Sequence, residues 1–579
     1  MYSVRSLTRA LGGLLLSGLA IAAPSSSHEL DVRASGSCNT PSNRACWSPG
    51  FDIHTDYEQK TPPGVVRTFN WEVTEIDNWK GPDGRVKSKV MLINNQYPGP
   101  TVTADWGDTI VINVKNSLRL NGTSIHWHGM RQLGTNIQDG VNGVTECPVP
   151  PGSSKTYKFR ATQYGSSWYH SHFSAQYGNG VFGSIVINGP ASLKYDIDLG
   201  AYPIFDYYLD TADDIVEQTL HTPAPPASAN VLFNGTNINP SGPGGAYSKV
   251  TFTPGKSHRL RLINPSVEHN YQVSIVGHNM TVIETDLVPV NPYKTDNVFL
   301  GVGQRADVII DASKAVGNYW MNVTMYASNA CGESTNPYPA AIVHYAGAPN
   351  KNPTDHGTLP ANSFCRDRLD YVPVVSRTAP LSQFTPSPAD TLDVTLEITN
   401  TVVWKVNASS IDVDWDRPVL DYVLKGNASY PRAENLVRID TPNAWTFWVI
   451  ENESGINHPM HLHGHDFLVL GASADNAGAF TTADKAALKG TNPARRDVTM
   501  LPANGWLVLA FKADNPGNWL FHCHIAWHVS GGLSVDFMER VSEQKKQVSA
   551  GDASAFNSNC AAWRSYYDQS PAKEIDSGL

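Results

Sequence analysis

The stretch GNWLFHCH at residues 517–524 has a counterpart in GSSWYHSH at residues 165–172. A third copy, GNYWMNVT at residues 317–324, keeps the aromatic side chains but has no histidine. Each copy follows a stretch of alternating apolar and polar residues, such as TIVINVK at residues 109–115, and this alternation is typical of a half-buried strand. Three such copies indicate one β-module repeated along the chain. The sequence therefore predicts an all-β fold.

We expect three β-sandwich or Greek-key barrel domains, because Gly and Pro turns separate short strands throughout the chain. The predicted ranges are residues 38–190, 191–372 and 373–579, and only the first and third contain the histidine-rich copies. Helix is expected to be a minor component, near residues 541–566.

The composition excludes several classes of protein. The chain has 579 residues, 43 of them basic and 53 acidic, and its net charge of −10 comes without the Lys and Arg clusters typical of nucleic-acid binding. Aromatic residues make up 10% of the chain, too many for a disordered protein. No stretch after residue 22 reaches the roughly 18 apolar residues that a membrane span needs. We therefore expect a globular protein with no nucleic-acid or membrane partner.

The first 22 residues have the layout of a secretory signal peptide: Arg5 and Arg9, then an apolar run, then Ala20-Ile21-Ala22. Residues 23–37 are polar, and we expect a short pro-segment there. Seven Asn-x-Ser/Thr sequons begin at Asn121, Asn234, Asn279, Asn322, Asn407, Asn427 and Asn452, a density that suits a secreted protein with N-glycans. The sequence thus predicts a secreted, extracellular glycoprotein, which we expect to be a monomer.

Ten of the 19 histidines fall in four clusters, and one cysteine lies among them. The clusters are His126-Trp-His128, His170-Ser-His172, His458-Pro-Met-His461-Leu-His463, and His522-Cys523-His524 followed by His528. Imidazole is a common ligand of zinc, copper, iron and nickel, and a thiolate favours soft metals. Because residues i and i+2 of a strand point to one face, each His-x-His pair aims two imidazoles at one side. We therefore expect a multinuclear metal site.

The triplet His522-Cys523-His524 predicts two metal sites, because on a strand the histidines face one way and the cysteine the other. Cys523, His528 and His458 form the two-His, one-Cys set of a blue-copper electron-transfer site. Leu533 stands where such sites often have a weak axial Met, and its side chain cannot coordinate a metal. Zinc is the second candidate, but structural zinc usually has four ligands in one closed set.

The four motifs together resemble those of the multicopper oxidases, and more closely those of secreted laccases from filamentous ascomycete fungi. The resemblance runs from about Cys38 to Leu579 and includes WYHSH at residues 168–172, NIQDG at residues 136–140 and DSGL at residues 576–579. It implies three cupredoxin-like domains and four copper ions: one type 1, one type 2 and a type 3 pair. It also implies that the last four residues plug the solvent channel toward the copper cluster.

The resemblance implies a role for each of eleven ligands. The type 1 copper would take His458, Cys523 and His528, with Leu533 in the axial position; the type 2 copper would take His126 and His461; one type 3 copper would take His128, His170 and His524, and the other His172, His463 and His522. An electron taken at the type 1 site would then pass from Cys523 to its neighbouring histidines.

Two carboxylates are candidate proton carriers. Asp139 matches the position of an acid near the trinuclear cluster, although an Asp-Gly turn would also explain it. Asp286 matches the position where ascomycete laccases hold a carboxylate against the phenol, and it would take the phenol proton as a general base. A surface acid in a loop is the alternative for Asp286. Trp527 and Trp404 are candidates for the wall of the donor site.

Six cysteines remain besides Cys523, and the resemblance suggests the disulfides Cys38–Cys46, Cys147–Cys560 and Cys331–Cys365. The activity it implies is that of a laccase, the one-electron oxidation of phenols and aromatic amines coupled to the reduction of O2 to water. Lignin-derived phenols and the phenols of pigments or secondary metabolites are the expected donors. Two alternatives stay open: a ferroxidase or ascorbate oxidase, and a secreted copper-binding glycoprotein without catalysis.

Overall fold

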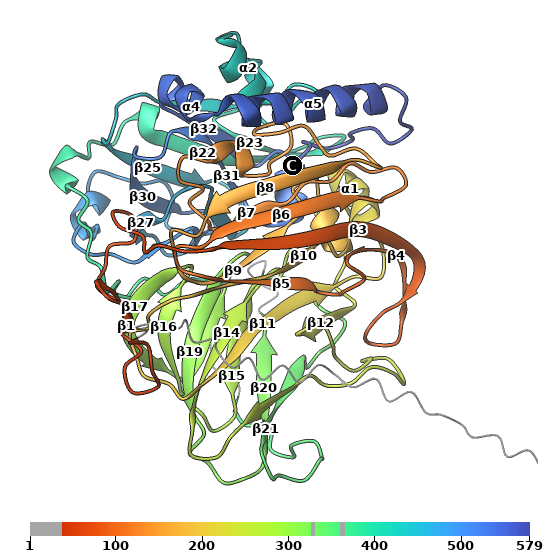
Figure 1. Ribbon diagram of the computed structural model, residues 1–579, viewed down its shortest axis with the longest axis vertical. Coiled ribbons are helices and arrows are strands. Elements are labelled where there is room, and N and C mark those ends of the chain that lie inside the picture. The colour runs from red at the N-terminus through yellow and green to blue at the C-terminus, as the bar shows by residue number, and fades with distance from the viewer. Residues whose placement is uncertain (1–37, 326–330, 359–364) are drawn as a thin grey trace, which may run out of the picture. The chain divides into compact units, whose positions relative to one another are not determined.

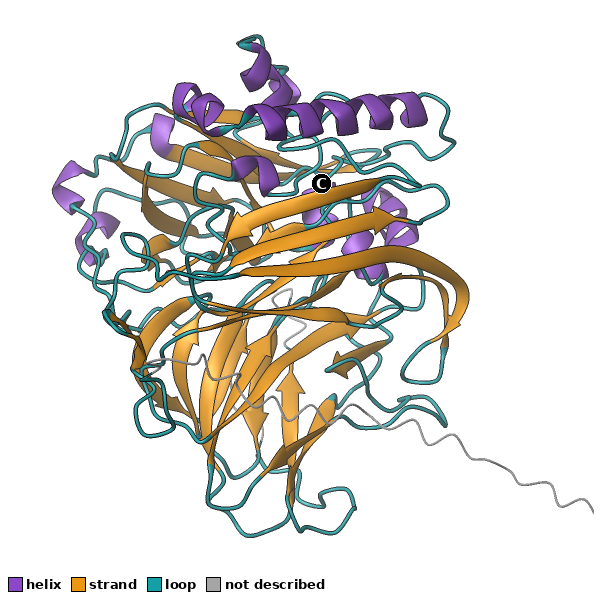
Figure 2. Cartoon of the chain, viewed as in Figure 1, coloured by secondary structure: helices purple, strands orange, loops and turns teal. Residues whose placement is uncertain are grey.

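The computed structural model describes residues 38–325, 331–358 and 365–579. The expected signal peptide at residues 1–22 and the pro-segment at residues 23–37 lie outside the described residues. Strands predominate over helices (Figure 2), which confirms the all-β prediction. No helix in the described part of the chain is long and apolar enough to cross a membrane.

Besides one short hairpin, the strands form three pairs of sheets, one pair in each of the three expected segments (Figure 1). The hairpin is β1 (Cys46–Ser48) with β2 (Phe51–Asp52). In the first segment one sheet has the order β4 (Val86–Ile93), β3 (Val66–Lys80), β6 (Thr109–Asn116) and β8 (Ser154–Arg160), and the other has β5 (Gly99–Asp105), β10 (Phe182–Asn188), β9 (Gly165–His170) and β7 (His126–His128).

The middle and last segments each add a six-stranded and a five-stranded sheet. In the middle segment the larger sheet has the order β12 (Asn230–Phe233), β11 (Ile197–Tyr207), β14 (Ser257–Ile263), β19 (Arg305–Asp311), β16 (Met280–Thr285) and β17 (Val288–Thr295), and the smaller has β13 (Lys249–Phe252), β21 (Ala340–Tyr345), β20 (Asn318–Thr324), β15 (Tyr271–Ile275) and β18 (Asn297–Leu300). In the last segment the larger sheet has β23 (Val402–Val406), β22 (Thr391–Ile398), β25 (Trp445–Asn452), β30 (Trp506–Lys512), β27 (Phe467–Ala472) and β28 (Arg495–Arg496), and the smaller has β24 (Leu436–Ile439), β32 (Ser534–Glu539), β31 (Gly517–Cys523), β26 (His458–Leu462) and β29 (Val498–Leu501).

The three copies of the sequence repeat occupy equivalent strands. They form β9, β20 and β31, and each of these strands lies between two neighbours of its sheet. The alternating stretches before them form β6, β14 and β25, and each pairs in parallel with an earlier strand of its segment. The repeated pattern in the sequence is therefore one topology used three times.

Helices connect and cover the sheets. The α-helices are α1 (Ala212–His221), α2 (Val419–Lys425), α3 (Ala526–Ser530), α4 (Val541–Gln547) and α5 (Ala550–Tyr567), and the 3-10 turns are η1 (Asn136–Gln138), η2 (Gln176–Asn179), η4 (Leu381–Gln383), η5 (Pro388–Asp390), η6 (Arg432–Glu434) and η7 (Asp484–Ala487). The pair α4 and α5 confirms the helix expected near residues 541–566. Ser549 caps α5 by accepting a hydrogen bond from the backbone N–H of Asp552.

Covalent and apolar contacts join the segments. The structure contains the disulfides Cys38–Cys46, Cys147–Cys560 and Cys331–Cys365, as expected, and leaves Cys523 as a free, buried thiol. The second disulfide joins the first segment to α5. One cluster of buried side chains includes Trp168, Phe205 and Trp519, which come from the three different segments. The histidine strands β7, β9, β26 and β31 are therefore carried by parts of the chain that pack together.

Candidate metal centres

The first centre consists of one sulfur and two imidazoles. Cys523 Sγ, at the end of β31, lies 3.5 Å from Nδ1 of His458 and 3.5 Å from Nδ1 of His528. The two Nδ1 atoms are 3.1 Å apart. Ser454 Oγ lies 3.0 Å from Nε2 of His458, on the side of the ring away from the sulfur. Three donor atoms thus converge on one point, and part of His528 remains exposed to solvent.

Backbone hydrogen bonds hold Leu533 beside this centre. Its N–H donates to the carbonyl of His528 (3.0 Å), and its carbonyl accepts from the N–H of Cys523 (3.1 Å). Its apolar side chain is fully buried. Trp404 of β23 packs against both imidazoles, with ring centroids 4.5 Å from His528 and 4.8 Å from His458.

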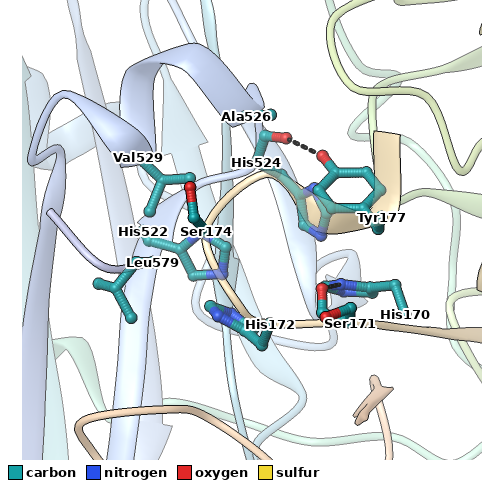
Figure 3. A pocket seen from close by; sticks show the side chains of 10 residues that line it. All are labelled: His170, Ser171, His172, Ser174, Tyr177, His522, His524, Ala526, Val529 and Leu579. Carbon is teal, nitrogen blue, oxygen red and sulfur yellow. Dashed lines mark hydrogen bonds between the residues drawn. The ribbon is translucent and has the colours of Figure 1, made fainter. Parts of the chain in front are cut away.

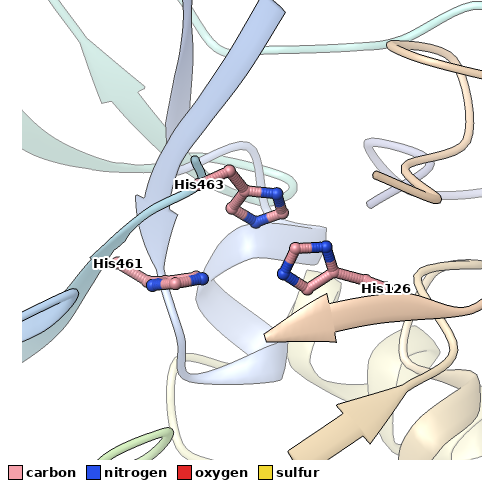
Figure 4. Close-up of side chains that lie close together, drawn as sticks. All are labelled: His126, His461 and His463. Atoms are coloured by element: carbon pink, nitrogen blue, oxygen red, sulfur yellow. The ribbon is translucent and has the colours of Figure 1, made fainter. Parts of the chain in front are cut away.

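The second centre consists of eight buried imidazoles from four strands or strand ends. His126 and His128 come from β7, His170 and His172 from the end of β9, His461 and His463 from β26 and the turn after it, and His522 and His524 from the end of β31. Nε2 of His463 lies 3.2 Å from Nε2 of His522, and Nε2 of His524 lies 3.2 Å from Nδ1 of His128. Figure 4 shows the rings of His126, His461 and His463 turned toward one another.

The triplet His522-Cys523-His524 contributes side chains to both centres. Cys523 belongs to the first centre, and its neighbours His522 and His524 belong to the second, as the alternation of a strand predicts. Four of the eight imidazoles, those of His170, His172, His522 and His524, line a cavity (Figure 3). The carboxy-terminal Leu579 lies in the same lining and is buried.

Many ring nitrogens of the second centre have no hydrogen-bond partner in the described part of the chain, and they are therefore free to bind a metal ion. Buried ring nitrogens without a hydrogen-bond partner among the described residues include Nε2 of His126, His170 and His461, both nitrogens of His172 and Nδ1 of His524. Burial lowers the pKa of the rings of His170, His172, His461 and His524, and that of His522 to about 3, so these rings are neutral near pH 7 and free to donate a lone pair.

The thiol of Cys523 supports the same conclusion. Burial raises the pKa of Cys523 well above its usual value, so the side chain ionises only next to a positive charge. A sulfur with two imidazoles suits a soft transition metal such as copper, and eight imidazoles suit a multinuclear site. Both donor sets therefore fit copper ions.

Two buried aspartates orient the imidazoles of the second centre. Asp139, which follows η1, has its Oδ2 2.8 Å from Nδ1 of His463, and its backbone carbonyl accepts from Nδ1 of His126 (2.8 Å). Sequence motifs identify Asp139 but not Asp497. The carbonyl of Asp497 accepts from Nδ1 of His461 (2.8 Å), and its Oδ1 lies 3.2 Å from Nε2 of His128. Carboxylates in such positions fix the tautomer and orientation of a ligand.

The structure does not bring Asp286 to the donor side of the molecule. Asp286 is 1% exposed, accepts from the backbone N–H of Arg305 (2.7 Å) through Oδ1, and accepts from Nε of Arg496 (2.7 Å) through Oδ2. A buried carboxylate with both oxygens bound in this way cannot reach a phenol. The role expected for Asp286 from the sequence is therefore corrected.

A different carboxylate, that of Glu268, binds Trp527, which is the neighbour of His528 in the chain. Its Oε2 accepts from the hydroxyl of Tyr208 (2.8 Å) and from Nε1 of Trp527 (3.4 Å), and Trp527 precedes His528 in the chain. Glu268 is partly exposed, whereas Trp527 is buried. Burial of the carboxyl raises the pKa of Glu268 to about 7. Sequence reasoning missed this residue because Val-Glu-His at residues 267–269 has no distinguishing motif.

A site of one cysteine and two histidines, joined through one triplet to a cluster of eight imidazoles, defines a multinuclear metalloprotein of the copper type. Comparison with known proteins agrees with this class. Residues 47–192, 200–348 and 384–543 match three family models, each described as multicopper oxidase. The chain therefore belongs to the multicopper oxidase family.

Several of the similar proteins in that family are fungal laccases. Laccase-1 of Melanocarpus albomyces is 56% identical, over 100% of this chain and 98% of the relative, and laccase-2 of Podospora anserina is 57% identical, over 94% and 90%. The crystal structure of a laccase from Botrytis aclada is similar with a TM-score of 0.86 and 39% identity, and the match covers 94% of this chain and 100% of that chain. The chain is thus an oxidoreductase of the laccase type, from a copper-binding family.

Proposed function

We propose that this protein is a secreted laccase that oxidises phenols and aromatic amines, one electron at a time, at the cysteine-containing centre and reduces O2 to water at the eight-histidine centre. The observation that carries the proposal is the triplet His522-Cys523-His524, whose middle residue serves one centre and whose outer residues serve the other. Residues that are adjacent in the chain therefore connect the two centres covalently.

We assign the copper ligands as follows. His458, Cys523 and His528 hold the type 1 copper with Leu533 beside it; His126 and His461 hold the type 2 copper; His128, His170 and His524 hold one type 3 copper, and His172, His463 and His522 hold the other. When bound, these ions supply one-electron redox chemistry at the first centre and O2 chemistry at the second. The convergence of His172, His463 and His522 on one point supports the last of these sets.

Residues around the two centres accept or deliver protons and form the walls of the donor site. Glu268 accepts the proton that a phenol releases as it loses an electron beside the partly exposed edge of His528, which avoids a high-energy phenol radical cation. Trp404 and Trp527 form walls of this donor site. Asp139 holds His463 and takes part in proton delivery to the second centre.

The C-terminal tail closes the second centre. Leu579 lines the cavity beside the imidazoles, the carbonyl of Gly578 accepts from Nε1 of Trp415 (2.9 Å), and Asp576 accepts from the hydroxyl of Ser174. We propose that residues 576–579 act as a plug of the solvent channel. We further propose the domain ranges 38–190, 191–372 and 373–579, an extracellular monomer with N-glycans, and donors among lignin-derived, pigment or secondary-metabolite phenols.

The test is O2 uptake by the copper-loaded protein with a methoxyphenol, an aromatic amine, Fe(II) and ascorbate. We expect uptake with the phenol and the amine to exceed uptake with the other two donors. Greater uptake with Fe(II) would favour a ferroxidase, and four bound coppers without uptake from any donor would favour a copper-binding protein without catalysis. The Cys523→Ser variant is expected to lose both the blue absorption and phenol-driven O2 uptake.

A further inference from the structure

Arg305 is a fully buried cation that comes from the segment without candidate ligands. It begins β19 and is 1% exposed. Its Nη1 and Nη2 donate to Oδ1 and Oδ2 of Asp497 (2.7 Å and 2.6 Å). Its Nε donates to the carbonyl of Ser166 in β9 (3.2 Å), and Nη1 also donates to the carbonyl of Gly303 (3.1 Å). One guanidinium thus contacts all three segments.

The carboxylate that Arg305 binds is in contact with the imidazoles of the second centre. Oδ1 of Asp497 lies 3.2 Å from Nε2 of His128, whose Nδ1 lies 3.2 Å from Nε2 of His524. The carbonyl of the same aspartate accepts from Nδ1 of His461 (2.8 Å). The rings of His128 and His461 are stacked, with centroids 3.9 Å apart and planes inclined by 10°. Asp497 therefore lies against His128 with its carboxylate and binds His461 with its backbone carbonyl.

Arginine is the side chain that this position requires. Its planar fork matches both oxygens of a carboxylate at once and fixes the carboxylate plane, whereas a lysine is a point charge on a flexible stem. Without a cation, the carboxylate of Asp497 would be buried and uncompensated, because it is 0% exposed. We expect it to turn away from its present place, 3.2 Å from Nε2 of His128.

Neighbouring residues hold both members of the ion pair. Asp286 accepts from the backbone N–H of Arg305 and from Nε of Arg496, the residue before Asp497. Gly303 lies so close to the imidazoles that an added Cβ would be 2.9 Å from Cε1 of His128, and its φ of +86° also favours glycine. The turn that carries Arg305 is therefore packed directly against the cluster.

We propose that Arg305 is a positioning residue for the eight-histidine centre: through Asp497 it sets the orientation of His128 and His461, so that the middle segment, which has no ligands of its own, determines how tightly the cluster holds copper. This inference rests on the proposed function, because it assumes that the imidazoles bind copper.

The test compares Arg305→Lys with Arg261→Lys. Arg261, in β14 of the same segment, is equally buried and also donates through two nitrogens to a carboxylate, Asp198. Its Nη1 donates to Ser166 Oγ and to Asp307 Oδ2. These partners include neither an imidazole of the cluster nor Asp497. Both substitutions replace the guanidinium of a buried ion pair by an ammonium. Only Arg305 is paired with a carboxylate that lies beside an imidazole of the cluster.

The measurement is copper retained per chain during dialysis against a series of chelator concentrations, together with the electron paramagnetic resonance signal of the type 2 copper. The blue absorption that depends on Cys523 reports the first centre in the same sample. We expect Arg305→Lys to weaken retention at the cluster by about 10- to 100-fold, a usual effect of removing a partner of a metal ligand, while the blue absorption persists. Arg261→Lys is expected to retain copper as the unaltered protein does.

Equal copper retention in Arg305→Lys and the unaltered protein would overturn the inference, and so would equal losses in the two variants. If Arg305→Lys does not fold, Asp497→Asn is the second variant, because it keeps the arginine and removes the charge that the arginine orients. Selective loss of cluster copper in Asp497→Asn supports the inference, and unchanged retention overturns it. An unaltered protein that binds no copper at the cluster would instead contradict the proposed function.

Discussion

Replacement of Glu268 by Gln tests the proton path at the donor site. The substitution keeps the shape of the side chain and one oxygen that accepts from Tyr208 or Trp527, but it removes the ability to take a proton. Phenols release a proton when they are oxidised, whereas ferrocyanide does not. The two donors therefore separate the loss of a base from damage to the copper site.

The size of the effect follows from the pKa of Glu268. Burial raises this pKa to about 7, so roughly 1% of the carboxyl groups are ionised at pH 5 and roughly 90% at pH 8. Because the base is the ionised form, kcat/KM for a phenol should rise about 90-fold over this interval through this group. At pH 7, Glu268→Gln should lower kcat/KM for the phenol by about 10²-fold, at the lower end of the usual contribution of a general base.

The assay is O2 uptake at several pH values with a methoxyphenol and with ferrocyanide. We expect Glu268→Gln to abolish the rise between pH 5 and pH 8 for the phenol and to leave ferrocyanide oxidation within about twofold. Asp286→Asn is expected to keep the rise between pH 5 and pH 8 for the phenol, whatever its overall rate, because Arg305 and Arg496 bind that carboxylate away from the donor site. Equal losses on both donors in Glu268→Gln, or an unchanged pH profile, would refute the role of Glu268.

Three further predictions concern stability and the second centre. Replacing Cys147 and Cys560 by Ser opens a bridge across 413 residues and should lower the free energy of unfolding by about 2–5 kcal/mol, seen as a lower Tm; an unchanged Tm would contradict it. Burial raises the pKa of Glu434 to about 9, with a contribution from Asp536, so the stability from its neutral form is complete below about pH 4.5 and is lost as the pH rises through 9. Glu434→Gln should therefore raise Tm relative to the unaltered protein at pH 9 and not at pH 4.5, and equal shifts at both would argue against it. Asp139→Asn should slow the reoxidation of the reduced protein by O2, seen as the return of the blue colour, by about 10- to 100-fold, because the amide no longer fixes His463. An unchanged rate would contradict a role of Asp139 at the second centre.

The repeats made much of the fold predictable. The alternation of apolar and polar residues is a local signal that predicts β6, β14 and β25. The repeated glycine with aromatic residues at a fixed spacing is a second local signal, and it predicts β9, β20 and β31. The two-sided arrangement of His522, Cys523 and His524 follows from strand geometry alone. The density of histidines in the four clusters was enough to predict that the clusters lie close together.

Local sequence signals could not predict the contacts of side chains in loops and of side chains that meet residues from another segment. Asp286 and Leu287 have φ angles of +48° and +64°, and this left-handed turn places the carboxylate of Asp286 inside, against Arg305, although no local sequence pattern indicates that contact. Glu268 and Asp497 reach the two centres because separate segments pack together, and no spacing within a single stretch records that packing. The clusters of candidate metal ligands were thus easier to predict than the carboxylates that lie beside them.

In the proposed function, Cys523 couples a donor site to a site that reduces O2 completely. The most direct test is the ratio of phenol oxidised to O2 consumed by the copper-loaded protein, with hydrogen peroxide measured in the same samples. We expect four one-electron phenol oxidations for each O2 and no peroxide. Two oxidations for each O2, with an equal amount of peroxide, would contradict it.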